Sequence, residues 1–95
     1  MNETKFTLDE STLAQTIISI FPRKGGEISK EALATLYATR RGIPKEQINI
    51  KHLTEDINEK LNLPKRQSIK IRRGHRDEFV KILPITRRRL RQLVS

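Results

Sequence analysis

The stretch SIKIRRGHRDEFVKIL (residues 68–83) decides the fold, because the hydrophobic pattern of the chain changes its period there. Residues 68–72 alternate polar and apolar side chains, which is typical of a strand with one buried face. Gly74 can supply the positive φ that a two-residue type II′ turn requires, so residues 77–83 can return as a second strand. We therefore predict a β-hairpin, in a register that a longer loop would shift. The expected pairs are Ile69 with Val80, Lys70 with Phe79 and Arg72 with Asp77.

Before the hairpin, the sequence indicates a first amphipathic helix over residues 8–21. Thr7 and Glu10 have the spacing of a capping box, in which each side chain accepts a hydrogen bond from a free backbone N–H at the helix start. Apolar residues follow at intervals of three and four, which predicts a face buried against the core. Ile28, after the Gly-Gly pair, could add one bridge to the edge of a sheet.

Two further helices are expected between this point and the hairpin. The second covers residues 30–41 and ends at Gly42, which can adopt the left-handed conformation. The third begins either at Pro44 or after an Asn49 cap. Its buried stripe would be Ile50, Leu53, Ile57 and Leu61. Its outward positions would be Lys51, His52, Thr54, Glu55, Asn58, Glu59 and Asn62.

The chain after the hairpin predicts a short basic helix that begins beyond Pro84. Its apolar side carries Ile85, Leu90, Leu93 and Val94. The length of 95 residues fits one domain with a modest core. We divide the chain into an N-terminal arm (1–6), a main domain (7–84) and a basic C-terminal helix or tail (85–95).

Positive charge is concentrated in the last third of the chain. The net charge is +9, yet residues 1–63 carry nine basic and nine acidic side chains and sum to zero. Residues 64–95 hold eleven basic residues against Asp77 and Glu78, so 11 minus 2 accounts for the whole excess. Such segregation creates a local positive potential that attracts polyanions. We expect binding of an anionic partner, and double-stranded DNA first among them.

Several other function classes lack their sequence signals. The chain has no cysteine, so disulfides, thiolate metal sites and cysteine nucleophiles are excluded. His52 and His75 lie on different elements without metal-ligand spacing, and the serines lack a nucleophile motif. We therefore expect no enzymatic activity, no catalytic or metal-binding residues, no cofactor and no small-molecule ligand. No apolar run or signal peptide points to a membrane, which favours a cytoplasmic, nucleoid-associated protein.

The order of elements resembles that of the winged helix-turn-helix family of DNA-binding proteins. The resemblance covers about residues 7–84. It rests on EISKEALATLYATRRG for the second helix, INIKHLTEDINEKLNLP for the third and SIKIRRGHRDEFVKIL for the wing. It implies a mainly α fold with a small β-hairpin (α+β): three helices, a wing and the short C-terminal basic helix.

In that family the third helix enters the major groove and the wing contacts the backbone or the minor groove. The resemblance therefore implies DNA contacts from Lys51, His52, Thr54 and Asn58, with Asn58 the best candidate for pairing with adenine. Arginines at a hairpin tip suit the negative potential of a narrow minor groove. The remaining expected DNA-binding residues are Lys65, Arg66, Lys70, Arg72, Arg73, His75, Arg76, Arg87, Arg88, Arg89 and Arg91.

These features leave the biological role and the partner open. The chain could regulate transcription or assist replication or a mobile element, and a palindromic site would require a homodimer, for which Leu90, Leu93 and Val94 offer a seam. Glu55, Asp56 and Glu59 place negative charge on the third helix, and phosphates would repel it. One alternative is therefore a protein-interaction module or inhibitor that docks on an acidic protein partner. Another is an RNA or ribosome binder.

Overall fold

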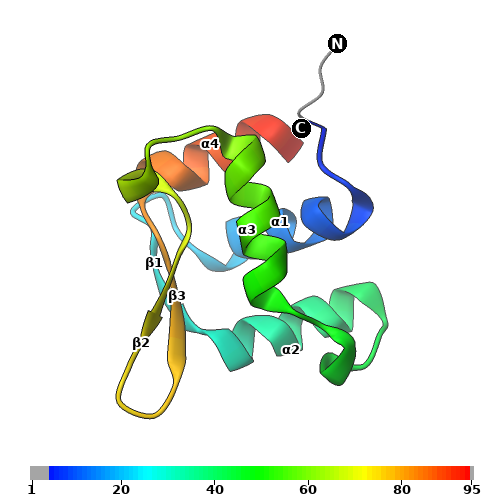
Figure 1. The fold of residues 1–95 in the computed structure, drawn as a ribbon. Helices are drawn as coiled ribbons and strands as arrows, with labels where there is room; N and C mark the ends of the chain where they lie inside the picture. Colours follow the sequence, from blue (N-terminus) through cyan, green and yellow to red (C-terminus); the bar gives the residue numbers. More distant parts are fainter. Residues whose placement is uncertain (1–4, 95) are drawn as a thin grey trace.

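A computed structural model describes residues 5–94, and Figure 1 shows the arrangement of the elements. The sheet lies at one side of the molecule with α1, α2 and α3 beside it, and α4 crosses above them. The helices are α1 (Leu8–Ile20), α2 (Lys30–Arg41), α3 (Ile50–Leu61) and α4 (Pro84–Val94), with single 3-10 turns η1 (Lys45–Gln47) and η2 (Lys65–Gln67). The strands are β1 (Gly26–Ser29), β2 (Lys70–Arg73) and β3 (Glu78–Ile82). The expected α+β class, mainly helical with a small sheet, is confirmed.

The sheet is antiparallel, with β3 in the centre and the order β1-β3-β2. The segment around Ile28 forms a strand of four residues that pairs with β3 from Gly26 to Ser29, more than the single bridge expected. One face of the sheet carries Ile28, Ile71 and Val80 in neighbouring positions and is directed into the core. The sheet thus ties the region between α1 and α2 to the hairpin that follows α3.

The predicted register of the hairpin was wrong. Ile71, and not Ile69, lies opposite Val80. The other observed pairs are Lys70 with Lys81, Arg72 with Phe79 and Arg73 with Glu78. The loop comprises residues 74–77 and is closed by a hydrogen bond of 2.7 Å from Gly74 N–H to the Asp77 carbonyl, so the turn is longer than two residues.

Gly74 has no positive φ and serves close packing instead of turn geometry. A Cβ at this position would lie 2.5 Å from the Phe79 ring, far inside van der Waals contact. The ring therefore covers the glycine backbone at the tip of the hairpin, and any other side chain here would displace it.

The helix boundaries follow their caps. The Thr7–Glu10 capping box is present, and α1 ends one residue earlier than expected, with Phe21 as its buried C-cap. Gly42 ends α2 in the left-handed conformation, as predicted. Asn49 accepts from the His52 N–H and begins α3, which decides between the two predicted starts. The core beneath these helices consists of Leu13, Ala14, Ile17, Phe21, Leu33, Ala34, Tyr37, Ile50, Ile57, Leu61, Ile69, Val80, Ile82 and Leu90.

An ion pair between the buried Glu10 carboxylate and the partly exposed Lys60 joins the start of α1 to the end of α3. Glu10 is only 5% exposed, and its Oε1 accepts from Lys60 Nζ at 2.5 Å and from the Thr7 N–H at 2.9 Å. Lys60 also donates to the Lys5 carbonyl at 3.0 Å. Since a buried charge needs a partner, loss of either side chain would leave the other uncompensated.

This pair predicts a pH dependence of stability. Burial by itself would raise the pKa of Glu10, but the hydrogen bonds from Lys60 and Thr7 outweigh it, so the pKa lies below its ordinary value of 4.5. A carboxyl with a lowered folded-state pKa stabilises the fold above its unfolded pKa and loses that contribution as the pH falls. We expect the free energy of unfolding to fall less between about pH 5 and about pH 3 in Glu10→Gln than in the natural chain.

Urea unfolding at each pH measures this difference. Lys60→Met removes the pair from the other side and should also remove the contribution of Glu10 to the acid-induced loss, at reduced stability near neutral pH. If both variants kept the natural dependence of the free energy of unfolding on pH, another carboxyl would be responsible.

Candidate nucleic-acid interface

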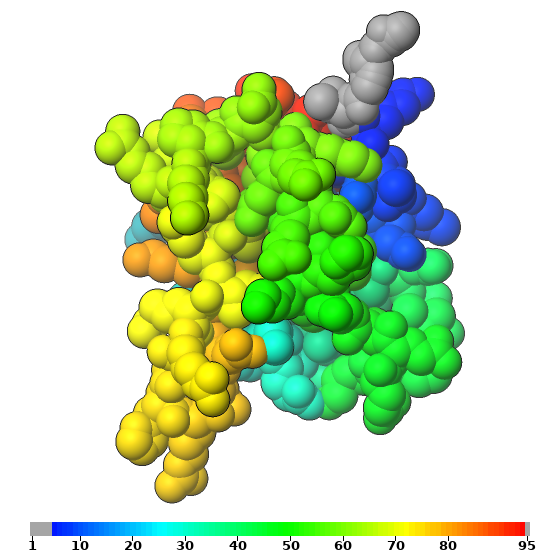
Figure 2. Space-filling view, viewed as in Figure 1, coloured from blue at the N-terminus to red at the C-terminus, as the bar shows by residue number. Residues whose placement is uncertain are grey.

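The hairpin of β2 and β3, here called the wing (residues 70–82), stands out from the body of the molecule. Figure 2 shows it in yellow and gold at the lower left. Its tip carries Arg73, His75 and Arg76, all exposed. Within residues 5–94 none of these three side chains forms a hydrogen bond or an ion pair. The tip therefore presents two arginines that form no hydrogen bond or ion pair in the described part of the chain, with Arg73 opposite Glu78 in the hairpin.

Arg72 is in a different state from the tip residues. Its Nε and Nη2 donate to the two carboxylate oxygens of Glu27 at 2.8 and 3.3 Å, and its guanidinium lies 6.0 Å from the centroid of the Phe79 ring. The hydrogen bond from Arg72 lowers the pKa of the Glu27 carboxyl and raises the pKa of Arg72. Arg72, an expected DNA contact, is therefore already paired with the Glu27 carboxylate of β1, on the other side of β3.

Further lysine and arginine residues, partly or fully exposed, lie along the wing and at its base. Lys70 is opposite Lys81 on the face that also carries Arg72, so two like charges lie side by side there. Lys65 and Arg66 are exposed on η2, just before β2. The structure thus brings most of the predicted wing residues onto one protruding element and its base.

The third helix supplies fewer outward side chains than its sequence suggests. Lys51 and His52 are exposed at its start, and His52 lies 3.5 Å from the Asp56 carboxylate. Thr54 does not face outward: it is 2% exposed and donates to the Lys51 carbonyl at 2.8 Å. Glu55 is exposed beyond it, so α3 changes from basic to acidic within one turn.

Asn58, the expected adenine contact, binds the protein's own backbone. Its Oδ1 accepts from the Ile69 N–H at 2.8 Å, and its Nδ2 donates to the Ile69 carbonyl at 3.0 Å. Both halves of the carboxamide are thereby occupied by the residue that precedes β2. Asn58 anchors the wing to α3 in place of the predicted base contact.

The C-terminal arginines divide into structural and exposed groups. Arg87 donates from Nε to the Phe21 carbonyl at 2.8 Å and from Nη2 to the Ile18 carbonyl at 3.2 Å, which satisfies free carbonyls at the end of α1. Arg89 does the same for α3 through the Leu61 carbonyl at 3.1 Å. Arg88 and Arg91 are exposed. Arg87 and Arg89 thus bind backbone carbonyls at helix ends, a role that was not predicted from the sequence.

The periodicity of residues 86–91 carries a signal for this division. Thr86 and Leu90, one helical turn apart, are both buried on α4. Arg87 and Arg89 flank that stripe, whereas Arg88 lies opposite it. Leu90 is completely buried in the chain's own core, so it cannot form the expected dimer seam with Leu93 and Val94.

Comparisons with known proteins return no relative. No family model matches the chain, and no curated protein or solved structure matches it. Within residues 5–94 no helix is long and apolar enough to cross a membrane. The same residues contain no group of three or more His, Asp or Glu side chains that could hold a metal ion.

The clamp between Asn58 and Ile69 gives a test of this part of the site. Asn58→Ala leaves the Ile69 N–H and carbonyl without partners, and we expect a loss of about 1–3 kcal/mol in the free energy of unfolding. Asn58→Asp keeps the acceptor but faces the Ile69 carbonyl with a carboxylate oxygen, and it should lose a comparable amount. Urea unfolding measures both. An Asn58→Ala chain with natural stability would argue that the clamp is absent in solution.

Proposed function

We propose that this chain is a winged-helix protein that binds double-stranded DNA, with the wing as its main contact. The proposal is supported by the order of three helices and a hairpin, by the three-stranded antiparallel sheet, and by the excess positive charge beyond residue 63. The observation that carries it is the exposed tip, where Arg73, His75 and Arg76 form no hydrogen bond or ion pair within residues 5–94.

The start of α3 lies toward the tip end of the wing, so one partner could touch both. Glu78, at the beginning of β3, forms an ion pair with Lys30 of α2. The hydrogen bond from Lys30 lowers the pKa of the Glu78 carboxyl, and the charges of Arg73 and Lys51 lower it further by smaller amounts. Lys51 is therefore near the wing, and a duplex held by the tip would meet α3 first at Lys51 and His52.

This arrangement favours backbone binding over base reading. Thr54 and Asn58 are used inside the protein, which leaves Lys51 and His52 as the outward candidates for base edges on α3. Arginine and lysine contacts to phosphate fix position and carry no sequence information. We propose modest sequence preference and action by occupancy, as in a regulator of transcription or an accessory factor of replication or of a mobile element.

Salt dependence tests the role of the tip. Each phosphate contact contributes roughly 0.9 to the slope of log K against log salt concentration. Arg73→Ala with Arg76→Ala should weaken binding to a random duplex at least tenfold and lower that slope by about 1–2, measured by fluorescence anisotropy across several salt concentrations.

A matched control separates the tip from net charge. Arg40→Ala removes one positive charge from the end of α2, and Arg76→Ala alone removes one from the tip. We expect Arg76→Ala to reduce the affinity for duplex several-fold more than Arg40→Ala. Equal effects would mean that overall charge, and not the wing, holds DNA.

A second candidate function rests on the acidic face of α3. Glu55 and Glu59 are exposed there, and neither forms a hydrogen bond or ion pair within residues 5–94. A face of this sign fits a protein surface better than a groove lined by phosphates. In this candidate, α3 binds a protein partner.

Charge removal on α3 distinguishes the two candidates. If α3 approaches phosphates, Glu55→Gln with Glu59→Gln removes repulsion worth about 1 kcal/mol or less for each carboxylate, and duplex binding should tighten severalfold. Anisotropy titrations in moderate salt measure the change. Unaltered affinity would place α3 away from the duplex and favour a protein partner.

A further inference from the structure

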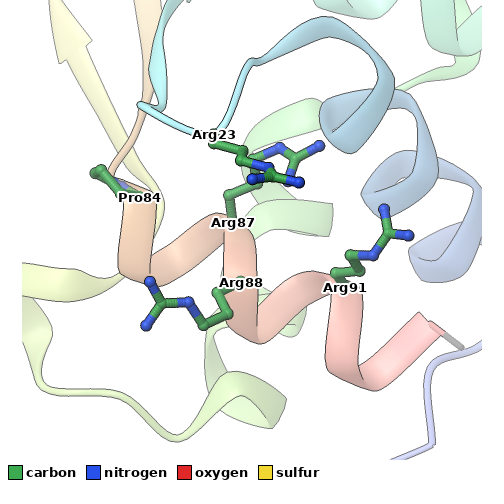
Figure 3. A pocket seen from close by; sticks show the side chains of 5 residues that line it. All are labelled: Arg23, Pro84, Arg87, Arg88 and Arg91. Atoms are coloured by element: carbon green, nitrogen blue, oxygen red, sulfur yellow. The ribbon is translucent and has the colours of Figure 1, made fainter.

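A hollow of about 540 Å³ lies between α4 and the turn that joins α1 to β1. Pro84 and four arginines form its wall: Arg23 from the turn, and Arg87, Arg88 and Arg91 from α4. Figure 3 shows Arg23 reaching from the turn toward Arg87, with Arg88 and Arg91 on either side along the helix. The volume falls within the roughly 300–1,000 Å³ of small-molecule sites. Within the described residues, no carboxylate lines it.

Hydrogen bonds hold one of these arginines in place. Arg87 binds the carbonyls of Phe21 and Ile18 through Nε and Nη2, and its backbone N–H donates to the Leu83 carbonyl at 3.0 Å. A guanidinium has more N–H donors than the two used here, and the rest remain available to a ligand. The floor of the hollow therefore has a fixed cationic group that needs no ordering when a ligand binds.

The wall opposite α4 is the turn that bears Arg23, and close packing of its backbone on the end of β3 holds it in place. Gly25 has φ +79°, and a Cβ on it would lie 2.3 Å from the Ile82 carbonyl oxygen, so the turn packs directly on the end of β3. The Gly25 N–H also donates to the Pro22 carbonyl at 2.8 Å. The turn that bears Arg23 is thus kept at a set distance from α4.

The charge of the hollow indicates the chemistry of its ligand. The guanidinium groups of Arg23, Arg87 and Arg88 lie around one space and repel each other, and an anion among them reduces that repulsion. Arginine binds phosphate oxygens in a bidentate manner, more specifically than lysine does. A phosphate group carries roughly −1.5 to −2 at neutral pH, so about two of them balance Arg23, Arg87 and Arg88.

We propose that this hollow is a second anion-binding site that takes a small ligand with two linked phosphate groups, as in inorganic pyrophosphate or a nucleoside diphosphate. This departs from the expectation of no small-molecule ligand. The site is separate from the wing tip, because β3 has five residues and its ends alone are roughly 13 Å apart. It does not depend on the proposed binding of DNA.

Titration of the full chain with inorganic pyrophosphate, followed by calorimetry at constant ionic strength, tests the site. Arg23 and Arg88 are exposed and form no hydrogen bond or ion pair within residues 5–94, so their replacement should not impair folding. We expect saturable binding with one site per chain, weakened at least tenfold by Arg23→Ala with Arg88→Ala. Arg23→Lys with Arg88→Lys keeps the charge but loses the bidentate geometry, and it should show an intermediate loss.

The wing variant Arg73→Ala with Arg76→Ala is the matched control, since it removes the same charge elsewhere. It should leave pyrophosphate affinity within twofold of the natural value. Equal weakening by both pairs, or no saturable binding by the natural chain, would overturn the proposal. So would weaker duplex binding by the Arg23 and Arg88 variant without pyrophosphate binding, because the hollow would then belong to a track for the DNA backbone.

Discussion

Two hydrogen bonds between the Asn58 carboxamide and the backbone of Ile69 determine how the wing is placed relative to α3. Ile69 immediately precedes β2, and β2 pairs with β3, which also pairs with β1. These hydrogen bonds therefore connect α3 to β2, and through β2 to the rest of the sheet. Core packing also joins the wing to α3, and the clamp adds a directional link that fixes the tip relative to the start of α3 for a partner that engages both.

The arginines of the C-terminal region have two physical roles. Arg87 and Arg89 satisfy carbonyls at the ends of α1 and α3, positions where a helix has no backbone donor of its own. They stabilise the packing of α4 on the helical body together with the buried Leu90. Net charge alone therefore overstates the cations available to a ligand, and the exposed set is concentrated in the wing, in η2 and around the hollow beside α4.

Local patterns in the sequence were sufficient for the helices and for the existence of the hairpin. The capping box at Thr7, the Gly42 terminus and the change of period at residue 68 each depend on neighbours within a few residues. The register of the hairpin was not accessible in this way. The observed register leaves a four-residue loop and places the Phe79 ring over Gly74, a packing contact that a turn rule does not include.

The sequence predicted the state of a candidate site residue correctly only where that residue is exposed and forms no hydrogen bond or ion pair within residues 5–94. Arg73, His75 and Arg76 lie at a loop tip and remain exposed, as the pattern of charge indicated. Asn58, Thr54 and Arg72 look like surface groups in the sequence, but their partners are distant in the chain or are backbone atoms. Glu27, which pairs with Arg72, is 45 residues away from it. A single sequence holds no direct record of such contacts.

The position of β2 at the border of the sheet has a consequence for the behaviour of the protein in concentrated solution. An unpaired strand edge is a template for pairing with another copy, and proteins oppose this with short strands and charged side chains. β2 has only four residues, three of them Lys70, Arg72 and Arg73. Like charge on this border therefore discourages intermolecular β-sheet growth, and its neutralisation by a polyanion would remove that protection against aggregation.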